Sequence, residues 1–181
     1  MLTITIPKSE MWDEVNEEFS YEDEVTITLE HSLVSLSKWE SKWHKAFLGK
    51  QEKTYEETLD YIKCMTITKN IDNSVYKRLT KDNIDQINEY IDNPMTATYL
   101  RNTPNNQQTN KEVVTSELIY YWMITFGIPV EFEKWHLNKL IALIRVCEMK
   151  NSTPKKRSSG DIARSHAAIN AANRAKYHTK G

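Results

Sequence analysis

The stretch Ser37-Lys-Trp-Glu-Ser-Lys-Trp-His-Lys-Ala-Phe-Leu-Gly49 indicates what kind of fold this chain adopts. Its three large aromatic residues, Trp39, Trp43 and Phe47, recur every fourth residue, and this spacing places them on one stripe of an α-helix. Gly49 closes the segment, as glycine commonly does at the C-terminus of a helix. The stretch therefore predicts an amphipathic helix whose aromatic stripe packs into a core.

Helical spacing of apolar residues recurs further along the chain. Thr54-Tyr-Glu-Glu57 is a capping box, in which the threonine hydroxyl accepts from a backbone amide and the glutamate returns to the amide of the cap. The helix that it opens is predicted to bury Tyr55, Leu59, Ile62 and Met65. Four further helices are predicted after Thr80 up to Asn93, over 112–126 (Val114, Leu118, Tyr121, Trp122 and Thr125 inward), over 132–150 and over 162–177. Four tryptophans on these stripes are predicted to be buried: Trp39, Trp43, Trp122 and Trp135.

The N-terminus has the period of a strand. Leu2, Ile4 and Ile6 alternate with threonines, and a second alternating run extends from Val25 to Val34. The two runs are predicted to pair as an antiparallel ribbon, with residues 8–24 as an acidic connection. Because an isolated two-stranded ribbon is marginal in water, we expect it to lie on the helices or on a neighbouring subunit.

The predicted fold is mainly α: a compact bundle of five to six helices with an N-terminal two-stranded antiparallel β-ribbon. Three parts are predicted, which are the ribbon with its acidic connection (1–35), the helical core domain (36–151) and a basic linker with a C-terminal helical tail (152–181).

Charge is distributed unevenly between the two ends. Residues 1–30 carry nine acidic residues and one lysine, whereas residues 150–181 carry eight basic residues and one aspartate. Such ends could pair between subunits, meet different partners, or simply be solvated surfaces. The basic residues predicted to dock a partner are Lys155, Lys156, Arg157, Arg164, Arg174 and Lys176. Nucleic acid is not the expected partner, because the isoelectric point is near 6.5 and stacking side chains are sparse in the tail.

The sequence contains no motif typical of an active site, a cofactor site or a metal site. With four glycines in 181 residues, neither a phosphate-binding loop nor a dinucleotide fingerprint is present. No zinc-type spacing joins the five histidines to each other or to Cys64 and Cys147, which are predicted to be buried thiols. No apolar run approaches the roughly 18 residues that a membrane span needs. We therefore expect a non-enzymatic protein without a cofactor, a metal or a membrane segment.

Several blocks resemble a family of small proteins encoded in the tail modules of tailed bacteriophages. The resemblance covers nearly the whole chain and is carried by the blocks at 29–43, 56–65, 116–129, 135–147 and 170–181, which include Ser116-Glu-Leu-Ile-Tyr-Tyr-Trp-Met-Ile-Thr-Phe-Gly-Ile-Pro129. Proteins of this family are usually taken as tail assembly chaperones, which are cytoplasmic helical proteins that coat the tape-measure protein and help tail-tube subunits to polymerise around it.

The resemblance implies a protein of the host cytoplasm that binds tape-measure protein and tail-tube subunits, and that could form a homo-oligomer. The alternative is a structural component of the virion, in the tail, connector or capsid. The family has no catalytic residues, so the resemblance implies no active site.

Overall fold

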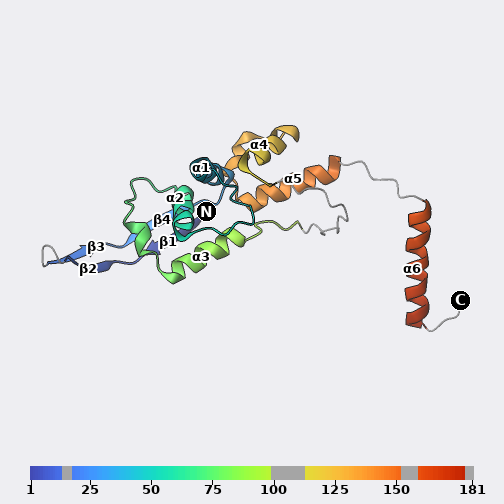
Figure 1. Ribbon diagram of the computed structural model, residues 1–181, viewed down its shortest axis with the longest axis horizontal. Helices are drawn as coiled ribbons and strands as arrows, with labels where there is room; N and C mark the ends of the chain where they lie inside the picture. The colour runs from blue at the N-terminus through green and yellow to red at the C-terminus, as the bar shows by residue number, and fades with distance from the viewer. Residues whose placement is uncertain (14–17, 99–112, 152–158, 178–181) are drawn as a thin grey trace. The chain divides into compact units, whose positions relative to one another are not determined.

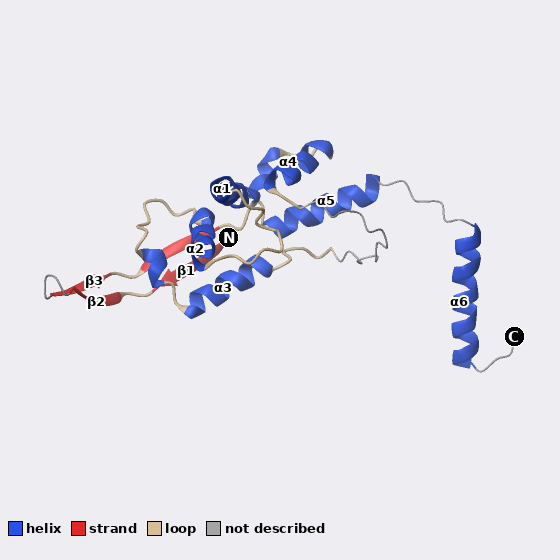
Figure 2. Cartoon of the chain, in the orientation of Figure 1, coloured by secondary structure: helices blue, strands red, loops and turns tan. Residues whose placement is uncertain are grey.

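The computed structural model describes residues 1–13, 18–98, 113–151 and 159–177. Within these ranges the chain forms six α-helices and four strands, so the mainly α fold with an N-terminal antiparallel ribbon is confirmed (Figure 2). In order, the elements are β1 (Leu2–Ile6), β2 (Ser9–Asp13), β3 (Glu18–Glu22), β4 (Val25–Leu29), α1 (Leu33–Trp43), α2 (Tyr55–Met65), the 3₁₀-helix η1 (Val75–Arg78), α3 (Lys81–Asp92), α4 (Ser116–Thr125), the 3₁₀-helix η2 (Val130–Lys134), α5 (Leu137–Asn151) and α6 (Ser159–Tyr177).

The chain divides into two compact units, Met1–Glu148 and Met149–Gly181. The first unit contains the ribbon and helices α1 to α4, together with most of α5. The second contains α6, whose residues are all exposed wherever the structure describes their side chains.

The ribbon packs on the helices, as one of the two sequence-based alternatives predicted. β1 and β4 pair antiparallel from Leu2 opposite Leu29 to Ile6 opposite Val25 (Figure 1). The isoleucines of the inner face join a core with side chains of α1, α2 and α3. The chain after α2 covers the other edge of β4, since the Ile67 amide donates to the Thr28 carbonyl (2.9 Å). The ribbon therefore has both a neighbour at the edge of β4 and helices against its inner face, which stabilise it.

The prediction for residues 8–24 was wrong in part, because this segment contains a second hairpin. β2 and β3 pair antiparallel, from Ser9 opposite Glu22 to Asp13 opposite Glu18. Arg78 of η1 holds the base of this hairpin through an ion pair with Glu22 and bonds to the carbonyls of Pro7 and Asp23. Acidic residues in this segment masked the alternation, since strand propensity depends strongly on context.

The second predicted strand was too long, and the first helix begins earlier than expected. β4 ends at Leu29, and Ser32 caps α1, which starts at Leu33. The Ser32 side chain accepts from the Ser35 amide while the Ser35 hydroxyl accepts from the Ser32 amide, so a serine pair forms a capping box without a glutamate. The four residues before Ser37, three of them apolar, therefore belong to the helix.

Two apolar clusters fill the first unit. The ribbon core contains Ile4, Ile6, Ile27, Leu29, Trp39, Tyr61, Ile62, Met65, Val75, Tyr76 and Ile87. The α4–α5 core contains Leu33, Leu36, Ile119, Met123, Leu137, Leu140 and Ile144. Helix α1 contributes to both clusters, and it is the element that joins them.

The capping box at Thr54 was predicted correctly, whereas the predicted inward faces of α2 and α4 were wrong in part. Tyr55 is exposed because it is the first residue of α2 and lies at the rim. On α4 the buried apolar residues are Ile119 and Met123, while Tyr121 is exposed. Because α4 is apolar on every side, its sequence contains no polar face from which the inward side could be read.

Only one of the four tryptophans predicted to be buried is fully so. Trp39 is 1% exposed, and its indole Nε1–H donates to the Glu57 carbonyl oxygen (2.8 Å). The other three are half-buried. Trp43 donates to an Asp60 carboxylate oxygen (2.9 Å) at the rim of the core, and Trp135 stacks on Phe132 with ring centroids 3.8 Å apart. Large aromatic rings with a polar edge favour such boundary positions.

Trp39→Ala is expected to lower the free energy of unfolding by about 3–5 kcal/mol, because it opens a cavity in the ribbon core and leaves the Glu57 carbonyl without its donor. Trp135→Ala, at a half-buried site, is the matched control and should cost distinctly less. Urea denaturation of both variants measures the difference. Equal losses would contradict the assignment of Trp39 to the core.

Candidate protein-interaction site

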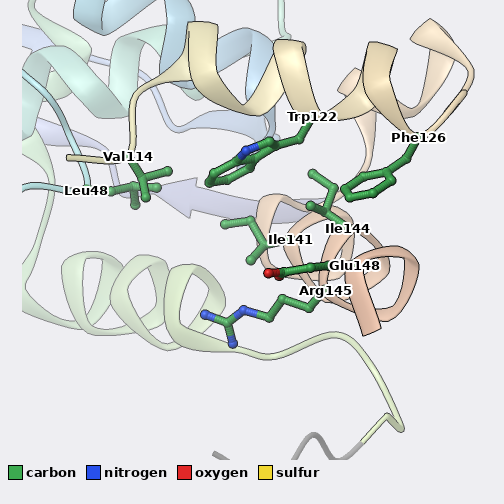
Figure 3. Close-up of a pocket in the computed structure, with 8 residues that line it drawn as sticks. All are labelled: Leu48, Val114, Trp122, Phe126, Ile141, Ile144, Arg145 and Glu148. Atoms are coloured by element: carbon green, nitrogen blue, oxygen red, sulfur yellow. The ribbon is translucent and has the colours of Figure 1, made fainter. Parts of the chain in front are cut away.

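An apolar groove lies between α4 and α5. It has a volume of about 480 Å³ and is lined by Leu48, Val114, Trp122, Phe126, Ile141, Ile144, Arg145 and Glu148. The rings of Trp122 and Phe126 point from α4 toward α5, where Ile141 and Ile144 meet them (Figure 3). Apolar side chains make up six of these eight lining residues, so the groove suits an apolar ligand surface better than a polar small molecule.

The walls follow from the helical period of the two helices. Trp122 and Phe126 are four residues apart on α4, and Ile141, Arg145 and Glu148 are spaced by four and three on α5. Residues at these spacings share one face of a helix. α4 turns Ile119 and Met123 into the core, so the neighbouring face that carries the two aromatic rings is left to form a groove.

Helix α4 also exposes apolar side chains away from the groove. Ile124 and Tyr121 on α4 are 80% and 61% exposed, and Leu48 and Val113 are also exposed. Helix α4 contains the uninterrupted apolar run Leu118–Ile124, and a helix that is apolar all round is normally buried. An apolar groove beside such a helix is typical of a protein-interaction site.

A buried carboxylate holds the groove in shape. Glu40 on α1 is 7% exposed, and its two oxygens accept from the Phe47 amide (2.8 Å) and the Ser116 amide (2.7 Å). The first bond fixes the segment that carries Leu48, and the second fixes the start of α4. A carboxylate at a helix N-terminus is also favoured by the helix dipole. Glu40 therefore positions two walls of the groove from behind.

Two more carboxylates hold the end of α1 and the loop that follows it. Glu57 pairs with Lys45 and accepts from the Thr54 amide (2.8 Å), and these contacts, the Lys45 bond foremost, lower the pKa of Glu57. Asp60 pairs with Lys42 and accepts from the Trp43 indole. Both carboxylates thus bind structural partners within the first unit.

None of the predicted docking residues that the structure describes is among the residues that line the groove. Lys155, Lys156 and Arg157 lie outside the described residues. Arg164, Arg174 and Lys176 lie on α6 and are exposed. The groove itself was missed. The signal for it was the seven-residue apolar run Leu118–Ile124, which leaves α4 without a polar face along these residues.

The structure also shows the surroundings of the cysteines and of potential metal ligands. Cys64 and Cys147 are half-buried free thiols, and burial raises the pKa of Cys64. Among the described residues, no group of three or more His, Cys, Asp or Glu side chains is arranged to hold a metal ion. The described helices include none with the length and apolar character needed to cross a membrane.

Searches of protein-family models, of curated proteins and of solved structures found no match to this chain. Functional inference therefore depends on the groove and on the residues themselves.

Glu40→Gln is expected to destabilise the first unit by about 1–3 kcal/mol, since an amide group can offer only one oxygen to the two backbone donors. The exposed Glu56→Gln on α2 is the control and should change the free energy of unfolding by less than about 0.5 kcal/mol. Urea denaturation followed by tryptophan fluorescence measures both. A Glu40→Gln variant as stable as the control would contradict the positioning role.

Proposed function

We propose that this chain is a non-enzymatic protein that assists the assembly of a bacteriophage tail by binding the tape-measure protein. One apolar face of a tape-measure helix occupies the α4–α5 groove. The observation that carries the proposal is the apolar wall of the α4–α5 groove, where the rings of Trp122 and Phe126 are only half-buried. Leaving this surface in water is unfavourable, and a partner helix would cover it.

The shape and chemistry of the groove favour a helix as its occupant. Two roughly facing helical walls offer apolar contacts at Trp122, Phe126 and Ile141, and an amphipathic helix presents anchors at the same spacing of three and four residues. Arg145 and Glu148 give this surface one charge of each sign on consecutive turns of α5. Opposite charges on the partner would set the direction in which its helix lies.

The sequence resemblance to tail-module proteins supports the choice of partner. In that family, chaperones of the host cytoplasm coat the tape-measure protein and help tail-tube subunits to polymerise. The alternative is a structural component of the virion. Mass spectrometry of purified virions separates the two: a chaperone should be absent from them, and a structural component should be present in stoichiometric amounts.

Groove variants are expected to weaken binding to purified tape-measure protein at least tenfold, or about 1.4 kcal/mol. Leu48→Asp places a carboxylate in an apolar wall, and Arg145→Glu reverses a lining charge; both positions are exposed, so folding should persist. Tyr55→Asp, at an exposed apolar residue of α2 that does not line the groove, is the control. Isothermal titration calorimetry measures the affinities. Groove variants that bind as tightly as Tyr55→Asp would refute this site.

We further propose that the basic tail adds an electrostatic contact to the same partner. Reversing the exposed charges in Arg174→Glu/Lys176→Glu should leave the thermal midpoint of unfolding unchanged, because all described α6 side chains are exposed. The affinity for the tape-measure protein should fall, and its dependence on salt should become weaker. An affinity and salt dependence equal to those of the unaltered chain would exclude a docking role for these residues.

A further inference from the structure

A buried histidine, His31, meets a half-buried one, His136, close to residues of both the ribbon core and the α4–α5 core. His31 lies between β4 and α1 and is 2% exposed, and its Nδ1 forms a hydrogen bond with the Tyr61 hydroxyl (2.6 Å). The ring of His136, just before α5, lies edge-on to His31 with centroids 5.0 Å apart. Tyr90 of α3 contacts His136 from its other side, with centroids 4.9 Å apart. The imidazole pair thus lies among side chains from α2 and α3.

The same place is where the N-terminus of α5 is attached to its neighbours. The Leu137 amide donates to the His31 carbonyl (2.8 Å). Asn138 donates to the carbonyls of Ile91 (2.8 Å) and Asn93 (2.9 Å), at the C-terminus of α3. These attachments are polar bonds between residues of both clusters, since Leu137 belongs to the α4–α5 core and Ile91 packs against the ribbon core. We refer to the His31–His136 pair and these bonds as the joint.

Hydrogen bonding shows where a proton would be taken up. The Nε2 of His136 lies 2.9 Å from the Tyr90 carbonyl, which can only accept, so Nε2 carries the proton in the neutral ring. The Nδ1 of the same ring is then a bare acceptor, and it is buried without a hydrogen-bond partner. A buried acceptor that lacks a partner is costly in the closed joint and can be protonated once the joint opens.

The charged and titratable groups around the pair do not favour protonation in place. Tyr61 faces it from α2 and Tyr90 from α3, while the positively charged N-terminus of Met1 acts on His136. The Glu30 carboxylate acts on Tyr90, and Glu40 acts on Tyr61. Burial, with His136 as the second cause, lowers the pKa of His31 to about 3. Burial is likewise the largest cause that lowers the pKa of His136, and the Tyr90 carbonyl offsets it in part.

The sign of the pH effect follows from these shifts. Both folded-state pKa values lie below the ordinary 6.5, so between pH 6.5 and the folded values an opened joint binds protons that the closed joint does not. Stability of the closed joint is therefore complete above pH 6.5 and is lost as pH falls. Consider a histidine ring that stays neutral in the closed joint and has its ordinary pKa in the opened joint. At pH 5 it raises the equilibrium constant for opening about thirtyfold.

We propose that the His31–His136 pair is an acid-sensitive joint, at which the N-terminus of α5 separates from the C-terminus of α3 while both apolar cores stay folded. Its opening does not depend on which partner occupies the groove. The opening is expected to be local, because the contacts that break are the hydrogen bonds of Tyr90, Asn138 and Leu137.

Hydrogen exchange of the full chain at pH 7.5 and pH 5.0, corrected for intrinsic rates, tests the joint. Backbone amides at the end of α3 and the start of α5 should lose at least tenfold protection at pH 5.0, while those of β1, β4 and α2 keep theirs. His136→Gln retains a donor for the Tyr90 carbonyl but removes one of the two titrating rings, so its loss of protection at pH 5.0 should be distinctly smaller than that of the unaltered chain, with the remaining loss due to His31. His44→Gln, at an exposed histidine, is the matched control and should open like the unaltered chain.

Three outcomes would overturn the proposal: unchanged protection at the joint, a uniform loss across the chain, or the same local loss in His136→Gln. NMR titration of the imidazole nitrogens in the unaltered chain gives a second test that does not depend on folding of the variant. Proton uptake by His136 should coincide with the loss of protection. An opening that occurs while both imidazoles remain neutral would also contradict it.

Discussion

Helix α1 is the element on which the rest of the first unit depends, because it supplies side chains to both apolar clusters. Trp39 enters the ribbon core, and Leu33 and Leu36 enter the α4–α5 core. On the same side of α1 as Leu33 and Leu36 lies the buried Glu40, whose carboxylate accepts from the backbone at Phe47 and Ser116. A buried carboxylate is tolerated only where it is fully hydrogen-bonded, so this contact fixes the position of α4 relative to α1.

The groove is a consequence of that arrangement. α4 uses one face for the core and has no polar face to present to water, so Trp122 and Phe126 line a groove and Ile124 is left exposed. A free-standing monomer gains nothing from such a helix, whereas a protein that binds helical partners does. The proposed function therefore rests on a surface that the fold holds in place but does not cover.

Local patterns predicted much of the fold because they depend on neighbouring residues. The stripe of Trp39 and Trp43 and the capping box at Thr54 were sufficient to place α1 and α2, although Ser32 starts α1 earlier than expected. The β2–β3 hairpin was missed because its acidic residues concealed the alternation. The inward face of α4 could not be read from a helix that is apolar all round. The pairing of His31 with His136 joins residues far apart in the sequence, so no local spacing could indicate it.

Site-specific photo-crosslinking with purified tape-measure protein tests the central claim most directly. A photoreactive residue at Leu48 or Arg145 reports on the groove, since both are exposed residues that line it, and one at Tyr55 reports on an exposed surface that does not line it. The account predicts crosslinks from the first two positions to one helical segment of the tape-measure protein, and none from Tyr55. Equal crosslinking from all three positions, or crosslinking from Tyr55 alone, would contradict it.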